Sequence, residues 1–236
     1  MAAHTITITE KLVLALVVII ITTGFALFFF NISLFYQYVI EDGLVEWLTV
    51  AGLFLACIVC FSRFFKLIGK RSLWFLTVCF LLGAFLFFVS GEEISWGMRI
   101  LNIKPSEFFE KNNAQAETNF HNLVVNGVKI NKLVFSLILT TVFGIYLVVV
   151  PIMHSKNEVV RNFLNRSAIP IPRVYQVISF VLLFIIVSLL RDGKSPELLE
   201  CGAALLFFLI VRYPKNESIF DRNQQHIRGD HSTSIS

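Results

Sequence analysis

Long apolar segments constrain this chain more than any other feature of its sequence. An α-helix needs about 17–25 apolar residues to cross a bilayer, and several segments reach that length with almost no charge. Of the 236 residues, 56% are hydrophobic, which exceeds what one soluble core could bury. The predicted membrane spans are Leu12–Phe30, Leu44–Phe61, Leu73–Ser90, Leu133–Met153, Val174–Leu190 and Leu198–Val211.

The fold class predicted from these spans is all-α, a polytopic membrane bundle of about six transmembrane helices. Hydrocarbon offers the backbone no hydrogen-bond partners, so spanning segments of this length must be helical. Leu12–Phe30 exceeds the apolar core of a secretion signal and lacks a small-x-small cleavage site, so we interpret it as a retained helix. Leu198–Val211 is short, which predicts that it begins near Glu197, tilts, or crosses a thinned bilayer.

Basic residues indicate how these spans are oriented. They gather after the second and fourth spans and directly after the last one, which places these three segments in the cytoplasm by the positive-inside rule. Both termini are then cytoplasmic, and residues 91–132 form one long outer loop between helices 3 and 4. We expect a transmembrane domain over residues 1–213 and a polar cytoplasmic tail over residues 214–236.

Acidic residues are concentrated at the predicted outer ends of the spans. A carboxylate near hydrocarbon costs several kcal/mol unless it is paired, hydrated or bound to a cation. These acids therefore either bind a divalent cation or a positively charged ligand, or are simply tolerated in outer loops. For Glu46, a position near a helix N-terminus explains part of its presence. The full set is Glu41, Asp42, Glu46, Glu92, Glu93, Asp192, Glu197 and Glu200.

Glu92 and Glu93 are adjacent at the end of the third span, where the helix dipole disfavours anions. If the helix continues through Trp96 and Arg99, these two residues and Glu92 lie on one stripe, and Arg99 can hold Glu92 in an ion pair. Glu93 would then point about 100° away, towards another partner.

The long loop supplies candidates for that partner. Pro105-Ser106-Glu107 predicts the start of a short helix on the membrane surface. If the later Asn-rich segment is helical, Glu117 and His121 point the same way at i, i+4. Such a pair can ligate a metal, or act as a base with its orienting group, or form a plain hydrogen bond.

Three motifs in the chain carry a resemblance. Residues 91–97 read GEEISWG, residues 117–122 read ETNFHN, and residues 41–43 read EDG. With these motifs the chain resembles an uncharacterised family of bacterial multi-pass membrane proteins, over about the second to fourth spans. The resemblance implies a multi-pass protein of the bacterial inner (plasma) membrane and brings no established activity.

Acids and a histidine at one membrane face are also similar to the chemistry of membrane-embedded zinc amidases such as alkaline ceramidases. Those enzymes use several histidines, whereas His121 is the single histidine expected on the outer side here. A three-histidine zinc site within one chain is therefore excluded, and carboxylates would suit Mg, Mn, Ca or a mixed Zn/Fe site.

The sequence lacks a phosphate-binding loop, a nucleophile elbow, a Rossmann glycine pattern and a basic aromatic groove. We therefore expect no nucleic-acid partner. The expected partners are membrane lipids, further copies of the chain, or other subunits of a membrane complex.

Three hypotheses follow, ranked in this order. In the first, Glu93 and His121, with Glu46 or Glu92, bind a divalent metal, and Glu117 is the general base of a hydrolase or transferase acting on a lipid or lipid-linked substrate at the outer leaflet. In the second, these residues form a polar network in a non-catalytic structural or accessory subunit, and Glu93→Gln lowers thermal stability. In the third, an oligomer conducts cations through a ring of acids. Residues expected to orient the site are Trp96, Arg99, Asn119 and Asn122.

Overall fold

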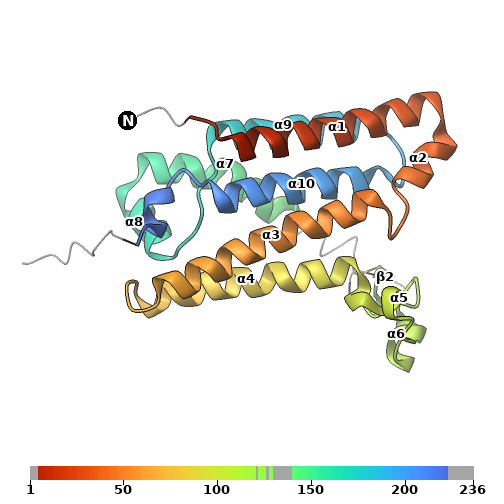
Figure 1. Ribbon diagram of the computed structural model, residues 1–236, viewed down its shortest axis with the longest axis horizontal. Helices are drawn as coiled ribbons and strands as arrows, with labels where there is room; N and C mark the ends of the chain where they lie inside the picture. Colours follow the sequence, from red (N-terminus) through yellow and green to blue (C-terminus); the bar gives the residue numbers. More distant parts are fainter. Residues whose placement is uncertain (1–4, 121, 126–127, 130–139, 223–236) are drawn as a thin grey trace, which may run out of the picture.

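The computed structural model describes residues 5–120, 122–125, 128–129 and 140–222. The regular secondary structure of this part of the chain is helical apart from one small hairpin, in which β1 (Val124–Val125) pairs antiparallel with β2 (Val128–Lys129). Its helices run roughly side by side and form an elongated bundle (Figure 1). They are α1 (Ile8–Phe30), α2 (Ile32–Tyr38), α3 (Leu44–Leu67), α4 (Leu73–Glu93), α5 (Met98–Leu101), α6 (Glu107–Asn112), α7 (Thr140–Lys156), α8 (Glu158–Arg166), α9 (Val174–Ser188) and α10 (Ser195–Arg212).

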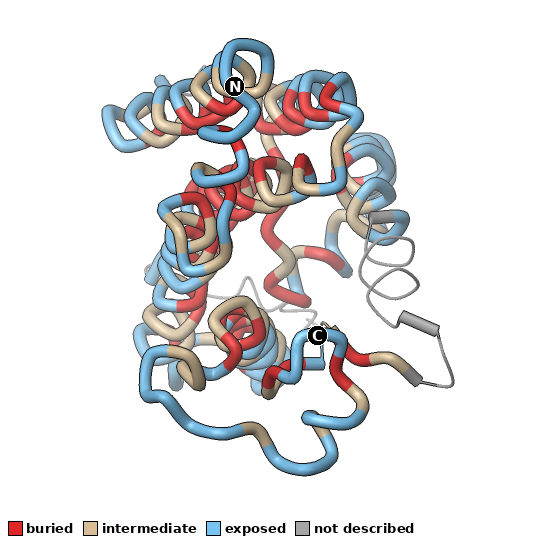
Figure 2. The backbone as a smooth tube through the Cα atoms, turned by 90° about the vertical axis from the view of Figure 1, so that its right-hand side faces the viewer, coloured by how far each residue is buried: buried red, intermediate tan, exposed pale blue. Residues whose placement is uncertain are grey.

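Three of the described helices, α1, α3 and α4, are long and apolar enough to cross a membrane. α7 and α9 are shorter apolar helices. Many large apolar side chains face outwards, including Phe29 on α1 and Leu81 on α4, and the outer surfaces of the helices are largely exposed (Figure 2). A helix surface of this kind suits lipid, so the chain has the character of a membrane protein.

α10 occupies the centre of the bundle, where it packs against α1, α3 and α9. Most of its residues from Cys201 to Val211 are buried. α3 approaches it closely at Gly52, where an added Cβ would lie 2.9 Å from the carbonyl carbon of Ala204. A small residue at this position lets the two backbones meet, as is common where membrane helices pack.

Several helix ends differ from the predicted spans for local reasons. α1 begins at Ile8, before the expected Leu12, because Thr7 and Glu10 form a capping box. Glu10 is fully buried and accepts a hydrogen bond from the Tyr175 hydroxyl. At the other end of α1, Asn31 interrupts the helix and caps α2 by accepting from the Leu34 amide. The expected start of the fourth span, at Leu133, lies outside the described residues.

The first part of the predicted polar tail packs against the bundle. Its short 3-10 helix (Glu217–Phe220) buries Ile219 beside Leu67 and Phe75. Asn216 is also buried, and its side chain accepts from the Ile171 amide at 3.0 Å. Residues 214–222 are therefore part of the folded unit, and residues 223–236 lie outside the described part of the chain.

The two ends of the bundle differ in structure (Figure 1). α2, α5, α6 and the hairpin lie at one end, whereas α8 and the α3–α4 connection lie at the other. We call residues 94–129, which follow α4, the cap segment, and refer to the two ends as the cap end and the α8 end.

Candidate functional site

The site begins with a sharp break after α4. Ser95, Trp96 and Gly97 all adopt positive φ values, of 47°, 55° and 74°. This conformation is uncommon for residues other than glycine and is retained only where the surroundings enforce it. Here Ser95 is completely buried, and the Trp96 ring lies against Gly91. The break ends α4 at Glu93, so the continuous helix that was expected to align Glu92, Trp96 and Arg99 does not form.

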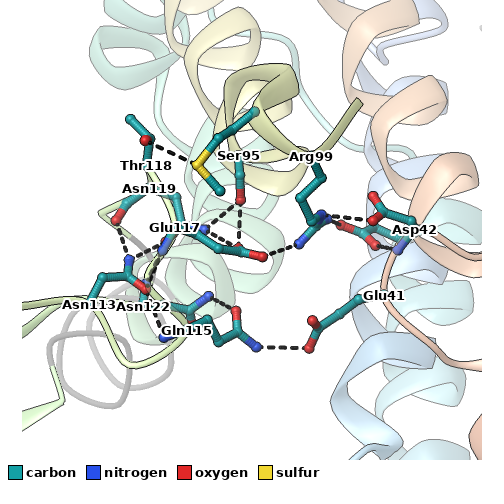
Figure 3. Close-up of polar contacts among 12 residues, drawn as sticks. Glu41, Asp42, Ser95, Arg99, Asn113, Gln115, Glu117, Thr118, Asn119 and Asn122 are labelled. Atoms are coloured by element: carbon teal, nitrogen blue, oxygen red, sulfur yellow. Dashed lines mark hydrogen bonds and ion pairs between the residues drawn. The ribbon is translucent and has the colours of Figure 1, made fainter. Parts of the chain in front are cut away.

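Because the chain turns here, the Arg99 guanidinium points towards the start of α3 (Figure 3). It contacts three carboxylates, with Nη1 to Glu117 and Nη2 to Glu46 both at 2.7 Å, and Nε to Asp42 at 2.8 Å. The Asp42 contact has the distance of an ion pair without the alignment of a hydrogen bond. The predicted Glu92–Arg99 ion pair does not form. Arg99 instead links the start of α3 to the cap segment through its three carboxylate contacts.

The surroundings of Arg99 strongly favour its charged form. Its side chain is only 19% exposed, and those of Glu46 and Glu117 are 10% and 9% exposed. Burial by itself opposes protonation, but the hydrogen bond and charge of Glu117 and the charges of Glu46 and Asp42 outweigh it, so the pKa of Arg99 is raised. Removal of the guanidinium would leave three acids without a compensating charge.

Both carboxylate oxygens of Glu117 accept hydrogen bonds within this network. One oxygen accepts from Arg99, and the other accepts from the Ser95 hydroxyl at 2.7 Å and from the Asn119 amide at 3.0 Å. Its own backbone N–H donates to the Asn113 side chain. Because both oxygens of this carboxylate already accept from protein donors, Glu117 is positioned to hold the cap segment.

Asparagine side chains hold the rest of the cap segment. Asn119 accepts from the Asn113 side chain at 2.9 Å and from the Asn122 backbone at 3.0 Å. Asn122 also donates to Gln115, which donates to Glu41 at 2.8 Å. The chain from residue 113 to residue 120 is not helical. The predicted i, i+4 relation of Glu117 and His121 therefore lacks its helix, and His121 itself lies outside the described residues.

Glu92 links the end of α4 to the cap segment through two hydrogen bonds. Its two oxygens accept from the Trp96 indole at 2.7 Å and from the Phe120 backbone at 2.6 Å. Glu46 is similarly occupied, because it accepts from Arg99 and from the Asp42 backbone. Both residues were candidate metal ligands. The contacts that they make here tie the end of α4 and the start of α3 to the cap segment.

Glu93 has different surroundings. It lies among like charges, interacting with Glu197 and Glu200 of α10 and with Glu46. Among the described residues, no side-chain hydrogen bond involves the carboxylate of Glu93 or of Glu200. Lys194 partly compensates the charge of Glu200, but it is itself paired with Glu41 at 3.2 Å and with Glu197 at 3.7 Å. Partial burial lowers the pKa of Lys194, but its contacts with these two acids dominate and raise it.

The described residues do not form a recognisable metal centre. Among them, no group of three or more His, Cys, Asp and Glu side chains is arranged to hold an ion. Glu46 and Glu92 direct their oxygens at protein donors, and of the predicted ligands in the described part of the chain only Glu93 is uncommitted.

Comparison with known proteins adds no relative. No family model matches the chain, and no curated protein or solved structure matches it. The fold and site therefore define the protein only as a helical membrane protein whose cap segment is held by an arginine-centred polar network.

Sequence reasoning identified some members of this network and missed others. Arg99, Trp96, Asn119 and Asn122 were predicted as orienting residues, and each makes a contact within the cap segment or to α3 or α4. Ser95 and Asn113 were missed. The density of Asn and Gln between residues 112 and 122 indicates a polar network in this segment. The partners of these residues depend on the turn at Ser95–Gly97, which no local sequence pattern predicts.

Proposed function

We propose that this protein is a non-catalytic structural or accessory subunit of a membrane complex, in which the polar network holds the cap segment as a preformed docking surface. The observation that carries this proposal is the triple contact of Arg99 with Asp42, Glu46 and Glu117. Glu46, a candidate metal ligand, and Glu117, the candidate general base, both contact Arg99 and thereby position the cap segment. A network satisfied in this way rigidifies what it joins.

The cap segment has a surface that a partner can use. Ile100, Leu101, Ile103 and Phe108 are each more than half exposed, although the backbone that carries them is fastened to the bundle. A rigid apolar surface loses little entropy on binding, and this favours docking of another protein or a second copy of the chain.

Site-specific photocrosslinking in native membranes tests this proposal. A photoreactive residue in place of Phe108 should give a discrete protein adduct, whereas the same residue at the exposed, charged position Lys111 should not. Introducing Arg99→Met together with the Phe108 probe should abolish the adduct, because the docking surface is no longer held. Adducts with lipid alone at position 108 would contradict the proposal.

One observation favours a second candidate, the metal-dependent hydrolase or transferase acting on a lipid at the outer leaflet. Glu93 lies among Glu197, Glu200 and Glu46 with little compensating charge, and a bound divalent cation would relieve that repulsion. In this candidate Glu93 is a ligand, with His121 as a further proposed ligand, and the metal activates a water molecule for attack. Glu117 would stay with Arg99.

Elemental mass spectrometry of the purified protein separates the two candidates. The structural role predicts that wild type and Glu93→Gln are equally free of tightly bound divalent metal. Near-stoichiometric metal in wild type that disappears in the variant would replace the structural role with the metal centre. The third hypothesis, cation conduction by an oligomer, stays a prediction that flux measurements in liposomes can test.

A further inference from the structure

The α8 end of the bundle carries an amphipathic helix that the proposed function does not use. α8 begins after Asn157, whose side chain accepts from the Val160 amide at 3.1 Å. Leu164 is buried against the bundle. On the opposite stripe, Val159 and Phe163 are 77% and 59% exposed, and the exposed Arg166 follows at the next turn. This i, i+4, i+7 spacing places two apolar groups and a cation on one outward face.

The first turn of α4 continues this face. The Trp74 indole donates to the Ser167 hydroxyl at 3.0 Å, directly after the end of α8. Trp74 and its neighbour Leu73 are 57% and 80% exposed. A tryptophan with an exposed ring beside apolar and basic residues is typical of the boundary between hydrocarbon and headgroups.

Cations at this end fall into two groups. Arg63, Arg71 and Arg173 contact the protein, through the Arg212 carbonyl, the Asp221 carbonyl and Glu217 respectively. By contrast, Arg166 and Lys70 are exposed and form no ion pair with any described residue. A general excess of positive charge would serve membrane insertion, but it does not require that Arg166 share one exposed face of α8 with Val159 and Phe163.

We propose that the exposed face of α8, together with the first turn of α4, lies in the headgroup region and binds anionic phospholipid. Val159, Phe163 and Trp74 enter the acyl boundary, while Arg166 contacts the headgroup phosphate. Charge complementarity selects an anionic lipid over a zwitterionic one, because each basic residue near the surface adds attraction to net negative headgroups. Apolar burial beside the cations favours a lipid over a soluble phosphate.

Native mass spectrometry of the full chain tests this proposal. The protein in detergent is mixed with equal amounts of phosphatidylglycerol and phosphatidylcholine, and the retained lipids are counted. Wild type should prefer phosphatidylglycerol, and Arg166→Gln should reduce the preference about fivefold, the effect of one basic residue. Phe163→Ser should reduce retention of both lipids.

Lys111→Gln is the matched control, since it removes one exposed cation at the cap end. It should leave the preference unchanged. An equal loss in Lys111→Gln would show nonspecific charge attraction and overturn the proposal. The absence of any preference in wild type would also overturn the proposal, and would indicate that this face binds an acidic protein. Complete displacement of the lipid by inorganic phosphate at matched ionic strength would overturn it as well, because it would indicate a site for free phosphate.

Discussion

Arg99 and Glu93 lie close together along the chain, and both have acidic surroundings, which compensate the charge of Arg99 and repel the charge of Glu93. The Arg99 guanidinium contacts three acids from two separate parts of the sequence. Glu93 faces Glu197 and Glu200 with little compensation. Single substitutions at these residues should therefore change stability in opposite directions, and each sign tests a different part of the site.

Arg99→Met should destabilise the protein. It leaves Glu46 and Glu117, both about nine-tenths buried, without their cation. Breaking a buried pair costs about 3–5 kcal/mol, and partial exposure of Arg99 places the expected loss near 3 kcal/mol. Thermal unfolding in detergent measures it. Lys111→Met, which breaks an exposed i, i+4 pair with Glu107, should change stability by less than about 0.5 kcal/mol. Equal effects would show that the Arg99 contacts contribute little.

Glu93→Gln should raise the unfolding temperature modestly, because it removes one of several mutually repelling charges. This reverses the expectation from sequence, in which Glu93 belonged to the supporting network. Glu117→Gln makes the same chemical change within the Arg99 network and should lower the unfolding temperature. Two results together would support the metal-centre candidate. Glu93→Gln would have a lower unfolding temperature than wild type, and added divalent metal would raise the unfolding temperature of wild type.

At the scale of elements, the contact between α3 and α10 depends on close backbone approach. Gly52→Ala should destabilise the bundle by about 1–3 kcal/mol, because its Cβ would press on the Ala204 backbone, which cannot rotate away. Gly144→Ala on α7 is the control, since nothing lies within 4 Å of its added Cβ. That substitution should be neutral or slightly stabilising. Similar unfolding temperatures for both variants would show that the α3–α10 interface adapts easily.

At the scale of the whole molecule, the bundle places the cap segment and the α3–α4 connection at opposite ends. Cysteine labelling in intact cells tests whether these ends face opposite sides of the membrane. An impermeant maleimide should label Lys111→Cys directly and Lys70→Cys only after permeabilisation. The four native cysteines are buried, which keeps the background low. Labelling of both positions without permeabilisation would contradict the predicted topology.

Local sequence is enough to locate most of the long helices. Apolar length and the lack of charge predicted α3 and α4 with correct starting residues, Leu44 and Leu73, because lipid-compatible helices are specified by local composition. The helix start at Ser106 likewise followed from a local signal, and α6 begins directly after it.

Which polar groups meet depends instead on the folded arrangement of the chain. The turn at Ser95–Gly97 has positive φ values that no local preference favours in Ser or Trp, so it forms only because Ser95 and Trp96 find partners in the folded protein. That turn takes Arg99 away from Glu92 and brings it to Asp42, Glu46 and Glu117. Spacing along a chain cannot encode such contacts, because they depend on how separate segments pack in space.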